Sequence, residues 1–201
     1  MSRPRKYDNS AILEAAAAVF LEAGAGAATA RIAERAGVSE GILFQRFKTK
    51  EALFEAAMTS ETGSDHWRKV LLENVGKGEP LSNLRTAILA LLEKLEKLIP
   101  KLMILEGQGT RRIPPPGPQA PPLEDATTIS TYLRREARRG RIRMDHFDLH
   151  AHEIVGAVVH YTMITLRHHT KICSAERLAG HLAAVHLGGC ESPKAGDRLS
   201  K

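Results

Sequence analysis

Apolar residues recur every three or four positions between Leu84 and Leu102, and this pattern limits the possible folds more than any other feature of the chain. Such spacing places the apolar side chains along one side of a helix, which other helices must then cover. Pro100 falls within the pattern, so we expect it to kink or divide the helix. The stripe consists of Leu84, Ile88, Leu91, Leu95, Leu98 and Leu102, widened by Leu92 and Ile99.

The rest of the chain supports an all-α fold. Ala and Leu are abundant, aromatic residues make up 4% of the chain, and runs rich in β-branched residues are missing, a composition that favours helices. Capping residues and apolar spacing predict further helices around this one. The expected ranges are 9–24, 30–36, a short helix after Ser39, 50–60, one around Trp67, 123–139, 147–169 and 174–188.

Charge and cysteine content narrow the class of protein. A formal net charge of +6 permits a polyanionic partner, although the basic arm of Arg3, Arg5 and Lys6 is expected to be a solvated tail. Cys173 and Cys190 give neither a disulfide framework nor the spacing of a metal site. Neither a secretory signal nor an apolar run of about 18 residues is found. We therefore expect a cytoplasmic protein with no membrane partner.

Residues 31–47, RIAERAGVSEGILFQRF, contain two short helical segments joined by a turn. Gly37 can end the first helix, and Ser39 can cap the second. Leu43 and Phe47 lie one turn apart and are expected to face inward. Packing then leaves Ile42, Gln45 and Arg46 facing outward, as in a helix-turn-helix motif.

DNA explains these outward residues better than solvent does, because the second helix of such a motif enters the major groove. We expect Gln45 to bond an adenine edge and Ile42 to meet a thymine methyl group. Arg46 can take a guanine or a phosphate, and its place late in a short helix favours phosphate. Gly41 would permit close backbone approach, and Lys48 and Lys50 would lie beside the DNA backbone. An ordinary helical hairpin with a few exposed side chains is the alternative.

The block AILEAAAAVFLEAG…IAERAGVSEGILFQRFKTKEALF, within about residues 9–56, resembles the N-terminal domain of the TetR family of bacterial transcriptional regulators. The AGVS-x-G-x-L-aromatic-x-x-F-x-x-K-x-x-L spacing carries this resemblance. It implies a three-helix DNA-binding domain (residues 1–50), a helical ligand-binding and dimerisation domain (51–190) and no enzymatic activity. The polar residues 191–201 are expected to form a flexible tail. The implied DNA-binding residues are Thr29, Ser39, Gly41, Ile42, Phe44, Gln45, Arg46 and Lys50.

Two positions depart from the family pattern. Phe44 stands where the family usually has a tyrosine, so a hydroxyl that would bond phosphate is missing. Ala28 stands where a threonine is frequent, which removes a cap or a phosphate contact at the start of the second helix. Because phosphate contacts position the protein without reading sequence, both changes should weaken affinity in general.

The resemblance also implies a homodimeric, ligand-released repressor that binds a palindromic, double-stranded DNA operator. A small, apolar effector would enter a cavity among the helices between residues 50 and 140. Residues that could line it are Trp67, Met103, Tyr132 and Phe147. The last two helices would form the dimer interface through Ile154, Val158, Tyr161, Leu178, Leu182 and Val185.

Two other functions remain open, a constitutive DNA-binding protein without effector and a His-dependent metalloenzyme. Among nine histidines, His146, His150 and His152 stand nearest to a ligand pattern, but His146 and His150 share a helix face only if the helix begins before 146. We predict no metal and no cofactor. The basic run 134–143 is expected to be a solvated helix end, and the proline-rich stretch 107–122 a loop.

Overall fold

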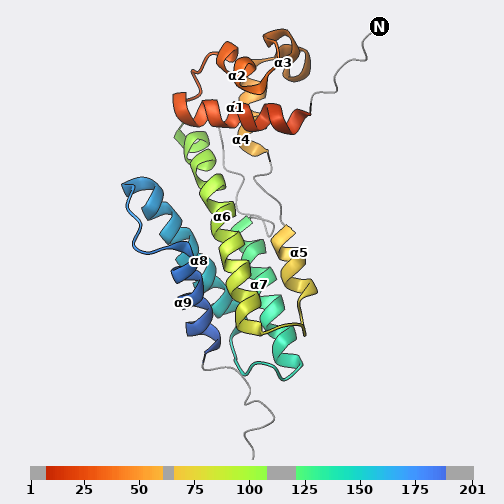
Figure 1. Cartoon of the computed structure of the whole chain (residues 1–201), viewed down its shortest axis with the longest axis vertical. Helices are drawn as coiled ribbons and strands as arrows, with labels where there is room; N and C mark the ends of the chain where they lie inside the picture. Colours follow the sequence, from red (N-terminus) through yellow and green to blue (C-terminus); the bar gives the residue numbers. More distant parts are fainter. Residues whose placement is uncertain (1–7, 61–65, 108–120, 189–201) are drawn as a thin grey trace, which may run out of the picture. The chain divides into compact units, whose positions relative to one another are not determined.

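The computed structural model describes residues 8–60, 66–107 and 121–188, and the regular elements in these ranges are α-helices (Figure 1). The prediction of an all-α fold is thereby confirmed. The basic arm, residues 108–120 of the proline-rich stretch, and the tail lie outside the described residues. The helices are α1 (Asn9–Ala23), α2 (Thr29–Ala36), α3 (Glu40–Phe47), α4 (Lys50–Thr59), α5 (His66–Glu73), α6 (Pro80–Gly107), α7 (Pro121–Arg138), α8 (Phe147–His168) and α9 (Ala175–Leu187).

Side-chain caps explain why several helices begin where they do. The Asp8 carboxylate accepts a hydrogen bond from the Ser10 amide at 3.0 Å, and the Ser39 hydroxyl accepts one from the Ile42 amide at 3.3 Å. Thr49 caps α4 in the same way, with 3.0 Å between its hydroxyl and the Ala52 amide nitrogen. Each cap satisfies an amide that has no partner within its own helix.

The chain divides into two compact units. The described part of the first comprises α1 to α4 and the last part of α6, from Lys97. Its core is mainly aliphatic, and within it the rings of Phe20 and Phe54 meet edge to face with centroids 5.0 Å apart. The fully or nearly fully buried side chains include Ile12, Ala16, Val19, Phe20, Ile32, Leu43, Leu53, Ala57 and Met58, with Leu105 from α6.

The second unit contains α5, the first part of α6, and α7 to α9. The apolar stripe of α6 is buried as predicted, with Leu84, Ile88 and Leu91 completely covered. This unit also encloses charge. The Asp125 carboxylate, 1% exposed, lies 2.7 Å from Arg68 Nη2 and 3.1 Å from Lys94 Nζ. Buried charges of opposite sign must stay paired, because neither can recover its hydration.

Pro100 does not divide α6, which continues from Pro80 to Gly107. A proline inside a helix removes one backbone hydrogen bond, and here the packing on both sides of it preserves the helix. Pro80 is the first helical residue, where the missing N–H would have had no partner in the helix anyway. In the described part of the chain, no helix combines the length and the apolar character needed to cross a membrane.

Candidate nucleic-acid interface

The turn between α2 and α3 is fixed by backbone geometry. Gly37 ends α2 with φ of 65°, in the left-handed region that favours glycine. The Gly37 amide donates to the Glu34 carbonyl at 3.1 Å, and the Val38 amide donates to the Ala33 carbonyl at 3.0 Å. These bonds close the end of α2 and turn the chain into α3. The predicted helix-turn-helix is confirmed.

One side of α3 holds it to the core, and the other is open. Leu43 is 1% exposed and Phe47 packs partly against the same cluster, as expected from their spacing. Gly41, Phe44 and Gln45 are exposed, with Phe44 at 40%. A buried anchor and an exposed face on one short helix are what groove recognition requires.

Ile42 differs from the prediction, because it does not point fully outward. Its side chain is half-buried and packs against the core cluster of the first unit. Position 42 lies at the border between the inner and outer sides of an eight-residue helix, so part of an aliphatic side chain there covers the core. The exposed part remains beside Gln45 on the outer side of the helix.

Residues 12–57 match the family described as bacterial regulatory proteins, tetR family. Residues 12–57 thus form a domain of the tetR family. Solved structures with the same fold include a protein from Mesorhizobium loti assigned to the TetR-family transcriptional regulators, with 19% identity and a TM-score of 0.67 over 96% of this chain and 100% of that one.

Two further solved structures are similar. SmeT, the repressor of the Stenotrophomonas maltophilia multidrug efflux pump SmeDEF, is 19% identical, with a TM-score of 0.64 over 94% of this chain and 93% of that one. The TetR transcriptional regulator SCO0520 from Streptomyces coelicolor is 23% identical, with a TM-score of 0.60 over 92% of this chain and 99% of that one. The helix-turn-helix lies within the residues that match the tetR family of bacterial regulatory proteins, and it is the DNA-binding element of a transcriptional regulator.

The basic residues around α3 are held in place. The Arg46 guanidinium donates a hydrogen bond to the Asn9 side-chain oxygen at the start of α1. Lys48 ends α3 with φ of 65°, and its ammonium donates to the Gln45 carbonyl at 3.0 Å. Lys50 is half-buried in the first turn of α4. Positive charge therefore gathers at the C-terminal end of α3 and the start of α4.

The start of α2 confirms one departure from the family pattern. Ala28 is the N-cap residue of α2 and supplies no side-chain hydrogen bond. Thr29, which the resemblance places at the DNA, donates its hydroxyl to Glu40 Oε1 at 3.3 Å. This bond joins the first turn of α2 to the first turn of α3. Thr29 therefore also positions the two helices of the motif.

Sequence reasoning missed residues that support the motif from outside it. The Glu22 carboxylate, on α1, accepts hydrogen bonds from Arg31 and Arg35 of α2, with 3.0 Å between Glu22 Oε2 and Arg31 Nη2. Asn9 orients Arg46 across 37 positions of the chain. Neither contact has a spacing signal, because the partners are on different helices.

The four residues expected to line an effector cavity do not form one group. Met103, 42% exposed, lies in the part of α6 that belongs to the first unit, whereas Trp67, Tyr132 and Phe147 belong to the second. Tyr132 is fully buried, and its hydroxyl lies 3.3 Å from Asn83 Nδ2 and 3.4 Å from the Pro80 carbonyl oxygen. Burial raises the pKa of Tyr132 well above its usual value. Tyr132 is thus a satisfied core residue.

Trp67 and Phe147 differ from Tyr132. Trp67 is buried, yet its indole Nε1 has no hydrogen-bond partner among the described residues. Phe147 is half-buried at the start of α8, and the Arg134 guanidinium carbon lies 5.7 Å from its ring centroid. An N–H that is buried without a partner costs free energy. Trp67 is therefore the strongest of the four positions for a bound molecule.

Most of the predicted dimer residues are buried inside their own chain. Ile154 and Val158 are completely covered, and Tyr161 and Leu182 are nearly so. These four side chains leave little surface for a partner, because an apolar stripe packs on its own core before it can meet a second chain. Leu178 is half-buried, and Val185 is 61% exposed. The exposed apolar side chains in this region are Leu149, Met163, Ile172 and Val185.

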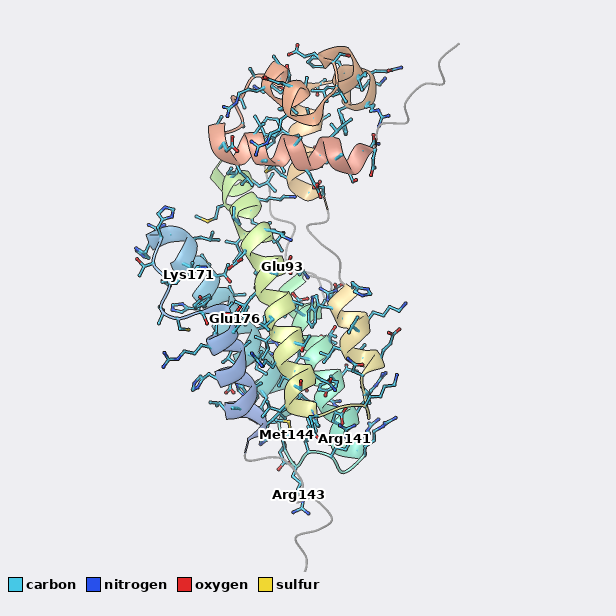
Figure 2. The ribbon with its side chains drawn as sticks, in the orientation of Figure 1. Glu93, Arg141, Arg143, Met144, Lys171 and Glu176 are labelled. Atoms are coloured by element: carbon cyan, nitrogen blue, oxygen red, sulfur yellow. The ribbon has the colours of Figure 1, made fainter. Side chains whose placement is uncertain are left out.

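The basic run 134–143, at the C-terminal end of α7 and just beyond it, is mostly solvated, and Arg141 is the half-buried exception. Figure 2 shows Arg141, Arg143 and Met144 on the segment that joins α7 to α8. Arg141 Nε lies 3.1 Å from the Glu136 carboxylate, which is completely buried. Glu136 also accepts a hydrogen bond from the Gly76 amide at 2.8 Å. Arg141 thus anchors the end of α7, while Arg143 is exposed as expected.

The histidines are arranged differently from the pattern considered in the sequence. Helix α8 begins at Phe147, and His146 precedes it with φ of 55°, so His146 and His150 do not share a helical face. His150 instead meets His186 of α9, with 2.9 Å between their Nδ1 atoms. Glu153 lies beside both. Burial lowers the pKa of His186, and the neighbouring His150 lowers it further. The Glu153 carboxylate opposes this shift.

Proposed function

We propose that this TetR-family regulator is a homodimeric repressor that binds a palindromic operator through α3 and is released from it by a small molecule. The observation that carries the DNA contact is the open face of α3, with Gln45 exposed next to the buried Leu43. Gln45 can bond the adenine edge in the major groove, and the exposed part of Ile42 can meet a thymine methyl group. SmeT, which shares the fold, is a repressor.

Gly41 supports close approach of α3 to the DNA. A Cβ atom built on Gly41 would meet only the Ser39 hydroxyl oxygen, at 3.7 Å, which is ordinary contact. Packing within the chain therefore does not require glycine at this position. We propose that glycine is present here because the DNA lies close by. The sugar-phosphate backbone can lie against the first turn of α3 only where no side chain projects.

The proposed dimer uses the outer faces of α8 and α9. Leu149, Gly156 and Met163 recur every seven residues along α8, and all three are exposed. A Cβ built on Gly156 would meet nothing within 4 Å, so this position can admit a second helix at close range. Val185 presents an apolar side chain on α9. A second copy of the chain would cover these residues.

The proposed effector is mainly apolar and carries one hydrogen-bond acceptor for the buried Trp67 Nε1. It would bind preferentially to the form of the dimer whose two α3 helices do not match the groove spacing. Near-complete switching between the two forms needs about a 10⁴-fold preference. Helix α4 directly follows the DNA-reading motif and is the proposed lever. We assign the protein no enzymatic activity.

Selection of bound DNA from a random pool tests this function. The purified protein should enrich an inverted repeat, with half-sites about one helical turn or a multiple of it apart. A single asymmetric site would contradict the dimer, and absence of enrichment would contradict DNA reading. Operator affinity is then measured with a panel of apolar compounds that carry a hydrogen-bond acceptor. If none changes it, the protein is a constitutive DNA binder.

A further inference from the structure

Three potential metal ligands converge where α8 meets the C-terminal part of α9. His150 and Glu153 come from successive turns of α8, and His186 comes from α9. The two Nδ1 atoms are 2.9 Å apart, and each lies 3.7 Å from Glu153 Oε2. All three ligand atoms thus lie within 4.8 Å of one another. This cluster plays no part in DNA reading or in the contact assigned to the effector.

These distances fit a tetrahedral cation. Zn²⁺ binds histidine nitrogen and carboxylate oxygen at about 2.0–2.2 Å, so two ligand atoms of one tetrahedral site are about 3.4 Å apart. The observed separations of 2.9 and 3.7 Å lie on either side of that value. The two imidazoles would have to separate by about half an ångström and exchange their direct contact for the ion, and the exposed Glu153 would move toward it by a few tenths of an ångström.

Burial gives the cluster a closed side and an open side. The His186 side chain is 7% exposed and the Glu153 side chain is 64% exposed, with His150 between them. The rings of His150 and His186 meet edge to face at 83°, which aims both Nδ1 atoms at the same region. In the single chain, a cation can therefore reach the two imidazoles from the side of Glu153, which lies on the face of α8 that the proposed dimer would cover.

The ligand types select the cation. Two imidazoles and one carboxylate suit zinc and the neighbouring first-row transition metals. Mg²⁺ and Ca²⁺ prefer shells made of oxygen, and here only one of three ligands supplies oxygen. Three protein ligands leave one tetrahedral position for water. The net charge of two neutral imidazoles and one carboxylate is −1, which also favours a divalent cation.

We propose that His150, Glu153 and His186 form a binding site for one divalent transition-metal ion, with zinc as the probe. The bound ion would join α8 to α9 within one chain and stabilise their packing. This site is independent of the proposed DNA-binding function, because all of its ligands lie in the second unit of the same chain.

The test uses the full-length protein, freed of metal and titrated with Zn²⁺ against a chromophoric chelator. The wild-type protein should bind one ion per chain at high affinity, and zinc should raise its melting temperature. Glu153→Gln, His150→Ala and His186→Ala should each weaken that binding by about tenfold or more. Because Glu153 is exposed, Glu153→Gln should fold normally and remains informative if His186→Ala does not.

His152→Ala and His160→Ala are matched controls, because both residues are exposed histidines of α8 outside the cluster. Their zinc affinity should stay within about twofold of the wild type. Zinc uptake that persists unchanged in His150→Ala and Glu153→Gln would overturn the proposal, since the ion would then sit on other histidines. A wild-type protein that binds no zinc would overturn it equally.

Discussion

The guanidinium of Arg46, in the last turn of α3, donates a hydrogen bond to the side chain of Asn9 in the first turn of α1. This contact ties the recognition helix to the helix that carries much of the core of the first unit. It also holds the positive charge at the end of α3, away from the middle of the outer face. We therefore propose that Arg46 holds a phosphate rather than a base.

Arg46→Ala should lower DNA affinity by about tenfold for operator and unrelated DNA alike, because a charge-assisted phosphate contact is lost. The dependence of log affinity on log salt should become shallower by about one unit. Fluorescence anisotropy over a salt series measures both quantities. Arg46 would instead be a base-reading residue if the variant lost only the discrimination between operator and unrelated DNA.

Phe44→Tyr should strengthen DNA binding by about threefold to tenfold, because the added hydroxyl can bond a phosphate. Phe44 is 40% exposed on α3, so the hydroxyl should not disturb the core, and the melting temperature should stay unchanged. The same anisotropy assay with operator and unrelated DNA tests this expectation. Unaltered affinity for both would show that the ring at position 44 does not face the DNA backbone.

Leu43→Ala should lower the free energy of unfolding by about 2–5 kcal/mol, because it removes a fully buried side chain from the first unit. Urea unfolding is best followed by circular dichroism, since the single tryptophan, Trp67, lies in the second unit. Gln45→Ala is the matched control on the exposed side of α3 and should change stability by less than about 0.5 kcal/mol. Equal effects of the two changes would contradict the assigned inner and outer faces.

Asp125→Ala should destabilise the second unit by about 3–5 kcal/mol, because it removes the buried carboxylate between Arg68 and Lys94. Trp67 fluorescence reports unfolding of this unit directly. Glu73→Ala provides the comparison, since the Glu73–Lys69 pair is 3.8 Å apart and exposed. Its loss should cost no more than about 1 kcal/mol. If Asp125→Ala lowered the free energy of unfolding by no more than Glu73→Ala does, the burial of Arg68 and Lys94 would not depend on the Asp125 carboxylate.

Helix positions were predictable from the sequence because their signals are local. Ser39 and Thr49 cap the helices that follow them, and Gly37 ends α2, as their chemistry indicated. The apolar stripe of α6 likewise marked its buried side. Residues three or four positions apart determine both kinds of signal, so a single sequence contains them.

The contacts between distant helices were not predictable in the same way. An apolar residue such as Ile154 gives the same spacing signal whether it faces its own core or a second chain, and here it is buried in its own core. His150 and His186 are 36 positions apart, and only the packing of α8 against α9 brings them together. Ile42 lies at a helix border, where spacing alone does not divide core from surface.

The central claim is that the outer face of α3 reads DNA bases, and parallel selection of DNA by the wild type, Gln45→Ala and Ile42→Ala tests it most directly. The wild type should select a palindrome. Each variant should lose about 1–3 kcal/mol of preference at a base pair in both half-sites, while still binding DNA. If both variants selected the same palindrome with undiminished preference at every position, α3 would not be reading bases through these side chains.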